Sequence, residues 1–248
     1  MTARAPRLKC QVRAIQLAIV VALLALPEIL VRTGLVSPFA LATTSDIAAS
    51  LWQMVVSGTI VQPLIDTLLL VVICFAIVAV SGVILGFCFW RWSLSRRAFE
   101  PLLMALYSIP GVVFYPVLLV TLGIGAPSIL GLGVLLGLVP VILGVQNALS
   151  GVDPVLARTA IILGASSWAK YTKVIFPAAL PGIGSALRLG FSYVVIGIIS
   201  GQFLVSTGGL GKLVAQYYDQ FQVADVYAAA FFIVVLAIVI NAVLERVK

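Results

Sequence analysis

Side chains suited to catalysis or metal binding are scarce in this chain. There is no histidine among its 248 residues, so the commonest general base and the commonest metal ligand are both missing. The eight acidic residues are scattered, and no two of them stand at a spacing that would pair them for acid–base chemistry. Cys74 and Cys88 would lie about 21 Å apart along a helix, which is too far for a disulfide. We therefore predict no catalytic site, no structural disulfide, and no metal or cofactor bound to this chain.

One glycine-rich segment is similar to a phosphate-binding loop. Gly208-Gly209-Leu210-Gly211-Lys212 ends in the required Gly-Lys pair. A true phosphate loop also needs glycine five residues before Gly211 and serine or threonine after the lysine. Ser206 and Leu213 occupy those two positions. We therefore expect no nucleotide to bind to this segment.

The composition identifies the environment in which the chain folds. Hydrophobic residues make up 62% of it, charged residues only 9%, and the mean hydropathy is +1.23. Soluble domains carry roughly 25% charged residues, enough to coat their surface. These values exclude a soluble enzyme, a disordered chain and a secreted disulfide scaffold. They predict an integral membrane protein.

Six apolar runs are long enough to cross a bilayer, whose core of about 30 Å needs roughly 20 helical residues. The predicted spans are residues 15–31, 64–90, 102–122, 128–149, 182–204 and 226–244. Pro110, Pro116 and Pro140 permit irregular helices within them. Ala40-Leu41-Ala42 fits a signal-peptide cleavage site but lies well past the first apolar run, so we expect that first helix to be retained.

The basic residues predict the orientation of these spans. If the N-terminus is cytoplasmic, every lysine and arginine except Arg32 and Lys212 lies on the inner side or snorkels to it. This distribution satisfies the positive-inside rule and places both termini in the cytoplasm. The net charge of +7 is therefore a topology signal and does not indicate binding to nucleic acid.

Two segments outside the predicted spans have helical patterns. Thr44-Ser45-Asp46 is typical of a helix start and precedes a short segment that runs through Val56. Apolar and aromatic residues recur at helical spacing between Leu210 and Phe221. That pattern favours either an amphipathic helix at the outer interface or an ordinary packed turn.

The longest cytoplasmic loop, residues 151–181, has a distinctive pattern. Asp153-Pro154 predicts a helix start, because aspartate caps free N–H groups and proline suits the first helical position. A break follows at Gly164, and a second helical run is expected from Trp168 to a stop at Pro177. The first run is apolar on one face, which either binds a partner or packs back onto the helix bundle.

This loop resembles the cytoplasmic signature of ABC importer permeases. The signature reads Glu-Ala-Ala, three residues, Gly, nine residues, then Ile-x-Leu-Pro. Ala160, Gly164 and Pro177 match it, and the family's glutamate falls on Arg158 and its first alanine on Thr159. Further segments resemble the nitrate/sulfonate/taurine branch: Ile109-Pro110-Gly111, Leu122-Gly123-Ile124-Gly125, Phe176-Pro177-Ala178-Ala179-Leu180-Pro181-Gly182-Ile183, Ala186-Leu187-Arg188-Leu189 and Gly208-Gly209-Leu210-Gly211. The resemblance runs from about Pro63 to the C-terminus.

The resemblance implies an all-α, six-span type I ABC importer permease of the bacterial inner membrane. Residues 1–61 would hold the N-terminus, first span and external linker, and residues 62–248 the permease core. The loop would be a coupling helix that docks on a separate ATP-binding subunit, where ATP is hydrolysed. The implied contact residues are Leu156, Arg158, Thr159, Ala160, Leu163, Gly164, Ala165 and Ser166.

The resemblance also implies further partners and a cargo. They are a periplasmic or lipid-anchored substrate-binding protein, a second copy of the permease, and membrane lipid. The cargo would be a small solute, with nitrate, sulfonates or taurine as the first expectation; close relatives also carry pyrimidine vitamin precursors.

Polar residues within spans are candidates for lining a pathway, because burying them in lipid is costly. Gln202, Ser192 and Asn147 are the candidates, with Gln202 preferred because it follows Gly201 deep in the fifth span. Each residue is equally suited to bond another helix. A different class, a self-sufficient secondary carrier or channel, would require inverted repeats and broken helices with intramembrane charges.

Overall fold

The computed structural model describes residues 5–205 and 208–246, and every regular element in these ranges is a helix. Arg4, Ser206 and Lys248 lie outside the described residues. The described residues form two compact units. One holds the residues up to 61 and those from 213 to 234, and the other holds residues 62 to 212 and those from 235 onward. The division of the chain after residue 61 into a linker and a permease core stays a prediction.

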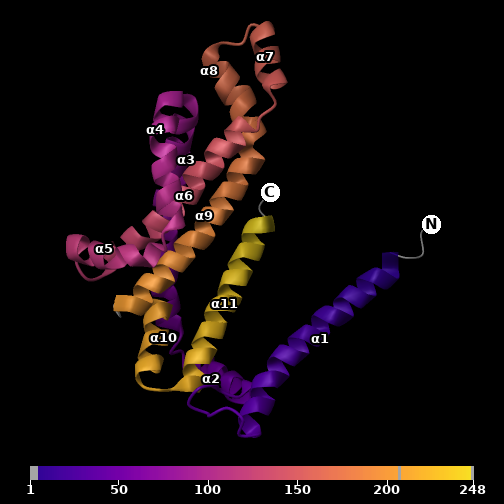
Figure 1. The fold of residues 1–248 in the computed structure, drawn as a ribbon, viewed down its shortest axis with the longest axis vertical. Coiled ribbons are helices and arrows are strands. Elements are labelled where there is room, and N and C mark those ends of the chain that lie inside the picture. The colour runs from indigo at the N-terminus through magenta and orange to yellow at the C-terminus, as the bar shows by residue number, and fades with distance from the viewer. Residues whose placement is uncertain (1–4, 206–207, 247–248) are drawn as a thin grey trace. The chain divides into compact units, whose positions relative to one another are not determined.

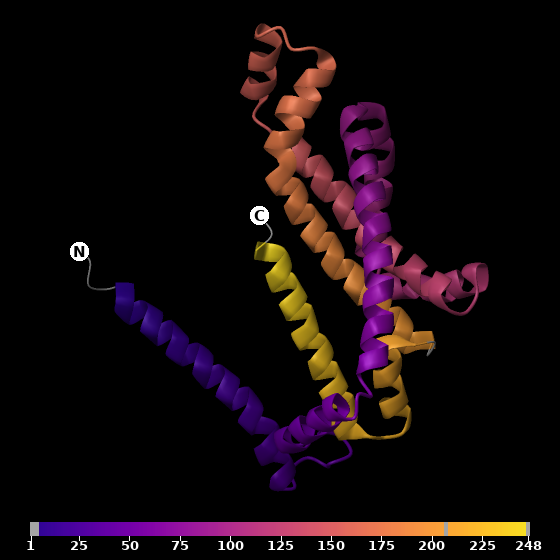
Figure 2. The ribbon, with the colours of Figure 1, turned by 180° about the vertical axis from the view of Figure 1, so that it is seen from behind.

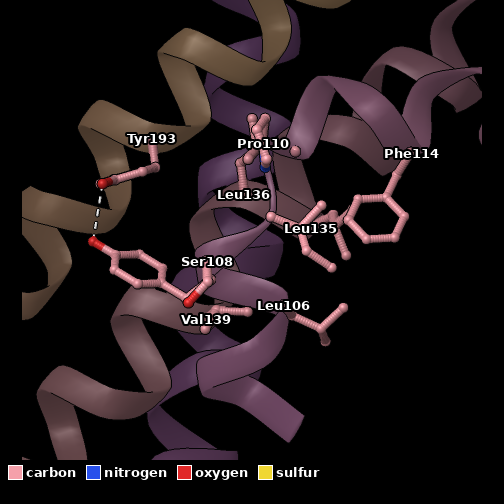
Figure 3. Close-up of a pocket in the computed structure, with 11 residues that line it drawn as sticks. Leu106, Ser108, Pro110, Phe114, Leu135, Leu136, Val139 and Tyr193 are labelled. Carbon is pink, nitrogen blue, oxygen red and sulfur yellow. Dashed lines mark hydrogen bonds between the residues drawn. The ribbon is translucent and has the colours of Figure 1, made fainter.

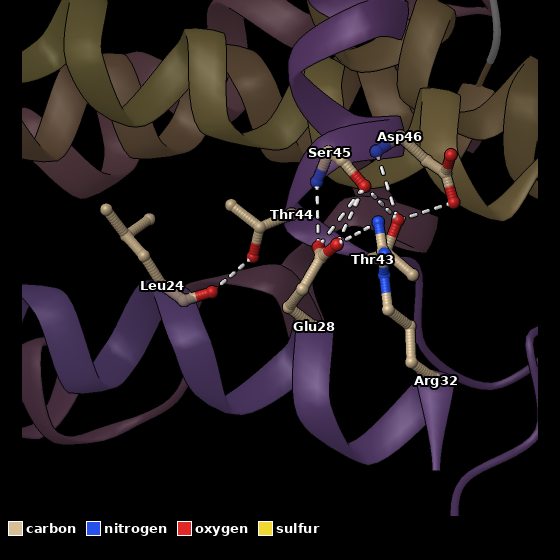
Figure 4. A network of polar contacts seen from close by, with 7 residues as sticks. All are labelled: Leu24, Glu28, Arg32, Thr43, Thr44, Ser45 and Asp46. Carbon is tan, nitrogen blue, oxygen red and sulfur yellow. Dashed lines mark hydrogen bonds and ion pairs between the residues drawn. The ribbon is translucent and has the colours of Figure 1, made fainter. Parts of the chain in front are cut away.

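The first unit holds α1 (Ala5–Arg32), α2 (Thr44–Val56), the end of α10 (Gly209–Asp219) and the first part of α11 (Val223–Arg246). The predicted helix start at Thr44 is confirmed, because the Thr43 hydroxyl accepts a hydrogen bond from the Asp46 N–H at 3.1 Å. Glu28 of α1 accepts from the Ser45 N–H at 3.1 Å and pairs with Arg32 at 2.6 Å (Figure 4). These polar contacts attach the end of α1 to the start of α2.

The second unit holds most of the membrane-spanning helices. Its elements are α3 (Val61–Arg91), α4 (Ser93–Ser108), the 3-10 turn η1 (Gly111–Phe114), α5 (Tyr115–Leu122), α6 (Ala126–Ser150), α7 (Pro154–Ile162), α8 (Ser167–Lys170), the π-helical turn η2 (Tyr171–Ile175), α9 (Phe176–Val205), the start of α10 and the end of α11. In both views α6 and α9 lie side by side (Figure 1, Figure 2). A buried cluster that includes Cys74, Val145, Val194 and Ile198 forms the core between α3, α6 and α9.

Glycines allow the central helices to approach closely. A Cβ on Gly197 of α9 would lie 2.7 Å from the Cα of Gly133 on α6, closer than real atoms approach. Small residues at such a crossing let two membrane helices pack backbone against backbone. Pro140 does not interrupt α6, which is the most deeply buried of the candidate spans.

Among the residues that the structure describes, four helices are long and apolar enough to cross a membrane, and a bent pair would make five. They are Val61–Arg91, Ala126–Ser150, Ser167–Leu204 and Val223–Val243, with α4 and residues 111–122 as the bent pair. The chain is therefore an all-α membrane protein, and the count of six spans stays a prediction.

The third predicted span, residues 102–122, is not one straight helix. α4 ends at Ser108, and the chain turns by 98° before it continues through η1 and α5. Ile109 is extended (φ −84°, ψ 133°), because a residue before proline is driven out of the helical region. Pro110 also has no N–H with which to continue the helix.

The predicted helix stop at Pro177 is wrong. The helix passes from α8 through η2 and Pro177 into α9 without a break. In η2 the Phe176 N–H bonds the carbonyl of Tyr171, five residues back rather than four. This extra residue in the turn before Pro177 relieves the clash that a proline ring makes with an ordinary helical turn.

Candidate functional site

The loop of residues 151–181 folds as the helix–glycine–helix that the sequence predicts. The Asp153 carboxylate accepts a hydrogen bond from the Val155 N–H at 2.8 Å, which caps α7. Gly164 follows α7 with φ +77°, and Ser166 caps α8 by accepting from the Ala169 N–H at 3.2 Å. A Cβ on Gly164 would meet nothing within 4 Å. The left-handed backbone, and not crowding, therefore favours glycine at this bend.

The apolar face expected along α7 divides between two environments. Ala160 is buried, whereas Leu156 and Leu163 are exposed. The end of the loop exposes four large apolar side chains, Ile161, Ile162, Leu163 and Trp168, of which Ile162 is 84% exposed. We call these four residues the coupling tip. Ala160 is thus covered by neighbouring residues and the tip is not, and a partner that binds the tip stays a prediction.

The sequence reasoning placed only Leu163 of the coupling tip among the contact residues. The sequence feature that could have indicated Ile161 and Ile162 is the unbroken apolar run Ile161-Ile162-Leu163 directly before Gly164. The other expected contact residues, Arg158, Thr159, Gly164, Ala165 and Ser166, lie at or near the surface of the same loop.

An aromatic cluster attaches this loop to the membrane helices. The Tyr171 ring, in η2, lies edge-on to Phe87 at 6.4 Å and to Trp90 at 6.1 Å, both at the end of α3. Arg91 lies 5.7 Å and Lys170 4.9 Å from the centre of the Tyr171 ring, within the range of cation–π attraction. The loop is therefore joined to α3 by aromatic contacts as well as to α9 by a continuous helix.

Gln202, the preferred pathway candidate, is fully buried in a hydrogen-bonded junction. Its Oε1 accepts from the Thr67 hydroxyl at 2.9 Å and from the Gly211 N–H at 3.3 Å. The Thr67 oxygen in turn accepts from the Leu210 N–H at 2.8 Å. This junction explains the need for glycine at residue 209, because a Cβ on Gly209 would lie 2.2 Å from the Gln202 amide. The arrangement favours the structural alternative for Gln202.

The other two pathway candidates do not join Gln202 in one site. Ser192 lies ten residues earlier on α9, or about 15 Å along the helix. Its hydroxyl is 3.2 Å from both the Arg188 carbonyl and the Asn241 side chain. Asn147 is exposed on α6. The three residues therefore line no common cavity among the described residues.

A pocket that sequence reasoning missed lies beside the break between α4 and η1. It has a volume of about 230 Å³ and is lined by Leu106, Pro110, Phe114 and residues of α6 and α9 (Figure 3). Across it the hydroxyls of Tyr107 on α4 and Tyr193 on α9 are hydrogen bonded at 2.9 Å. The sequence feature that could have indicated this pocket is Tyr107, which stands just before Ile109-Pro110-Gly111 in an otherwise apolar run.

The arrangement is that of a membrane helix bundle with one helix–glycine–helix loop, and comparison with known proteins shows its family. Residues 78–248 match the family described as "Binding-protein-dependent transport system inner membrane component". The chain belongs to this family. The matched residues contain the loop of residues 151–181, the pocket, and Gln202, which is hydrogen bonded to Thr67. Helices α1 and α2 lie outside them.

Individual relatives of this permease are transport permeases as well. It is 26% identical over 183 residues to the formylaminopyrimidine transport permease protein ThiX of Halalkalibacterium halodurans, which covers 73% of each chain. It is 24% identical over 217 residues to the putative aliphatic sulfonates transport permease protein SsuC of Bacillus subtilis, covering 88% of this chain and 78% of that one.

A solved structure supports the fold of this permease. An inward-facing structure of the MetNI methionine ABC transporter superposes with a TM-score of 0.64 at 22% identity, covering 73% of this chain and 91% of the other. The resemblance inferred from the loop signature is therefore confirmed: the chain has the fold of an ABC importer permease.

Proposed function

We propose that this permease carries a small solute from an external binding protein across the bacterial inner membrane, driven by ATP hydrolysis on a separate subunit. The observation that carries the proposal is the exposed coupling tip beside Gly164. Large apolar side chains at a cytoplasmic loop are costly in water and mark a surface that another protein covers. In this proposal neither ATP nor another cofactor binds the permease chain itself, and no reaction is catalysed on it.

The helix–glycine–helix suits the transmission of force. Two capped helices joined at Gly164 form a compact element that can be pushed without bending. Closure of two ATP-binding subunits would move this element, and Tyr171 would carry the movement to α3 while the continuous helix through η2 carries it to α9. Alternating access of the helix bundle follows from such a movement.

The proposed assembly contains two permease chains, since a single subunit of this family forms half of the pathway. Both termini lie in the cytoplasm. The contact with the ATP-binding subunit comprises the coupling tip with Leu156, Arg158, Thr159, Ala160, Gly164, Ala165 and Ser166. Arg158 replaces the family's glutamate, so the facing groove should offer it an acidic or neutral partner.

The cargo belongs to the range that the relatives' names describe. These names include sulfonates, nitrate and formylaminopyrimidine. A small oxyanion is the expectation from the sequence, and the relatives include both oxyanion and ring-containing cargoes.

A self-sufficient carrier is the alternative function. The broken helix at Pro110 is one feature that such carriers share. The pocket at this break has no charged lining residue, however, so it offers no group for coupling to protons or sodium ions.

A pull-down from detergent-solubilised native membranes tests the proposal. Wild-type permease should recover an ATP-binding subunit, and the double variant Ile162→Glu/Leu163→Glu should lose it, because two charges replace the apolar centre of the tip. Thr172→Glu is the matched control, since Thr172 is exposed on the same loop but outside the tip. If a stable wild-type protein recovers no ATPase, the result would contradict the ABC importer and favour the self-sufficient carrier.

A further inference from the structure

We propose that the pocket beside the α4 break receives the transported solute, and that this solute is an uncharged molecule built on one flat ring system. The inference rests on the proposed function, because it assigns a place in the pathway to a cargo that the permease carries.

The first argument is the position of the pocket at an interrupted helix. The Leu106 carbonyl would normally accept from the N–H four residues later, but residue 110 is proline and has none. In a membrane, such unsatisfied backbone groups are tolerated only inside protein or beside a hydrated cavity. Gly111 then brings η1 tightly against α6, because a Cβ there would lie 2.0 Å from the Leu136 side chain. The break therefore borders a half-open pocket, one side of which is packed protein.

The second argument is the absence of charge. The lining residues are aliphatic, aromatic or hydroxyl-bearing, and no lysine, arginine, aspartate or glutamate is among them. An anion entering this half-open pocket would give up part of its water without meeting a countercharge, which is unfavourable. The lining chemistry thus disfavours nitrate and sulfonates at this place and favours a neutral solute.

The third argument is the arrangement of aromatic rings and hydroxyls. The rings of Tyr107 and Tyr193 have centres 5.8 Å apart and are inclined by 46°, and Phe114 lines the same cavity. In their mutual hydrogen bond only one tyrosine uses its O–H as donor. The pair therefore still offers one donor and several acceptor positions, which suit the N–H and C=O groups at the edge of a ring.

The fourth argument is size. The cavity holds about 230 Å³, and an apolar protein cavity of roughly 150 Å³ is enough to bind benzene. One ring with small substituents, or two fused rings, fills the available space.

Cysteine protection tests this inference on the full-length permease in complex with its ATPase in lipid nanodiscs. Cys10, Cys74 and Cys88 are replaced by alanine, and a single cysteine is placed at Ser108 in the pocket. Its matched control is Thr121→Cys, which is exposed on α5 outside the pocket. Labelling by a maleimide is followed with increasing indole, nitrate or methanesulfonate.

Indole should slow the labelling of Ser108→Cys about tenfold when it is present at about ten times its Kd, and leave Thr121→Cys unchanged. Nitrate and methanesulfonate should protect neither position. Adding Tyr193→Phe, which removes a hydroxyl but keeps the ring, should weaken protection by indole several-fold. Protection by the anions alone, or by no probe, would overturn the inference.

A second measurement covers the case in which the cysteine substitutions disturb packing. Equilibrium dialysis of radiolabelled indole should show binding to the otherwise unmodified complex and its loss in Leu135→Trp, which fills the cavity. An intact ATPase complex without indole binding contradicts the pocket assignment only. A wild-type permease that recovers no ATPase contradicts the proposed function itself.

Discussion

Thr67 on α3 donates a hydrogen bond of 2.9 Å from its Oγ1 to the Oε1 of Gln202 on α9, and both side chains are buried. The same threonine oxygen accepts from the Leu210 N–H, and the same glutamine oxygen accepts from the Gly211 N–H. Two side chains thereby satisfy two of the free N–H groups in the first turn of α10 and attach that turn to two membrane helices.

Thr67→Val should destabilise the permease. The substitution keeps the shape but removes the hydroxyl, so the buried Leu210 N–H loses its acceptor, at a cost of about 1–3 kcal/mol in the free energy of unfolding. Unfolding in mixed detergent micelles measures the loss. Thr121→Val is the control, because the Thr121 hydroxyl is exposed and bonds only carbonyls of its own helix. Equal stability of the two variants would contradict the role of the junction.

Gly211→Ala should also be destabilising. Its added Cβ would lie 2.3 Å from the Ile199 carbonyl oxygen, so the backbone must shift at a cost of about 1–3 kcal/mol. Gly184→Ala in α9 meets nothing within 4 Å and should raise stability by about 0.5–1 kcal/mol, because glycine is unfavourable inside a helix. The opposite order in thermal unfolding would refute the close packing over Gln202.

Substitutions at Gly164 should separate backbone conformation from bulk. Gly164→Asn should retain the ATPase in pull-downs, since asparagine adopts left-handed backbone at little cost. Gly164→Val should bind about tenfold more weakly, because a left-handed β-branched residue costs about 1–2 kcal/mol. Equal recovery by both variants would show that the bend conformation is not needed for docking.

Tyr171→Ala should uncouple the permease without releasing its ATPase. The coupling tip is untouched, but the contact of Tyr171 with Phe87 and Trp90 is lost. We expect normal ATPase recovery together with a reduced response of ATP hydrolysis to the loaded binding protein in proteoliposomes. Tyr171→Phe keeps the ring and should behave as wild type. Loss of ATPase recovery in Tyr171→Ala would instead give the cluster a docking role.

Local sequence predicted the features that depend on a few neighbouring residues. Asp153-Pro154 and Thr44-Ser45-Asp46 were predicted as helix starts, and the structure confirms both, with Asp153 and Thr43 as the caps. Such starts are predictable because a capping group lies within one turn of the free N–H group it satisfies. The membrane class followed from composition alone, since so few charges cannot coat a soluble surface. The spacing from Gly164 to Pro177, together with the other matching segments, indicated the family that the comparison with known proteins then confirmed.

The tertiary structure decided the features that depend on distant partners. Pro177 was expected to end a helix, but η2 inserts one extra residue and the helix continues. Ala160 and Leu163 share a predicted face, yet only Ala160 is buried. The pocket arises because α4 breaks at Pro110 opposite a tyrosine more than eighty residues later in the chain. Helical periodicity specifies which side chains share a face, but what that face meets is set by the packing of other helices.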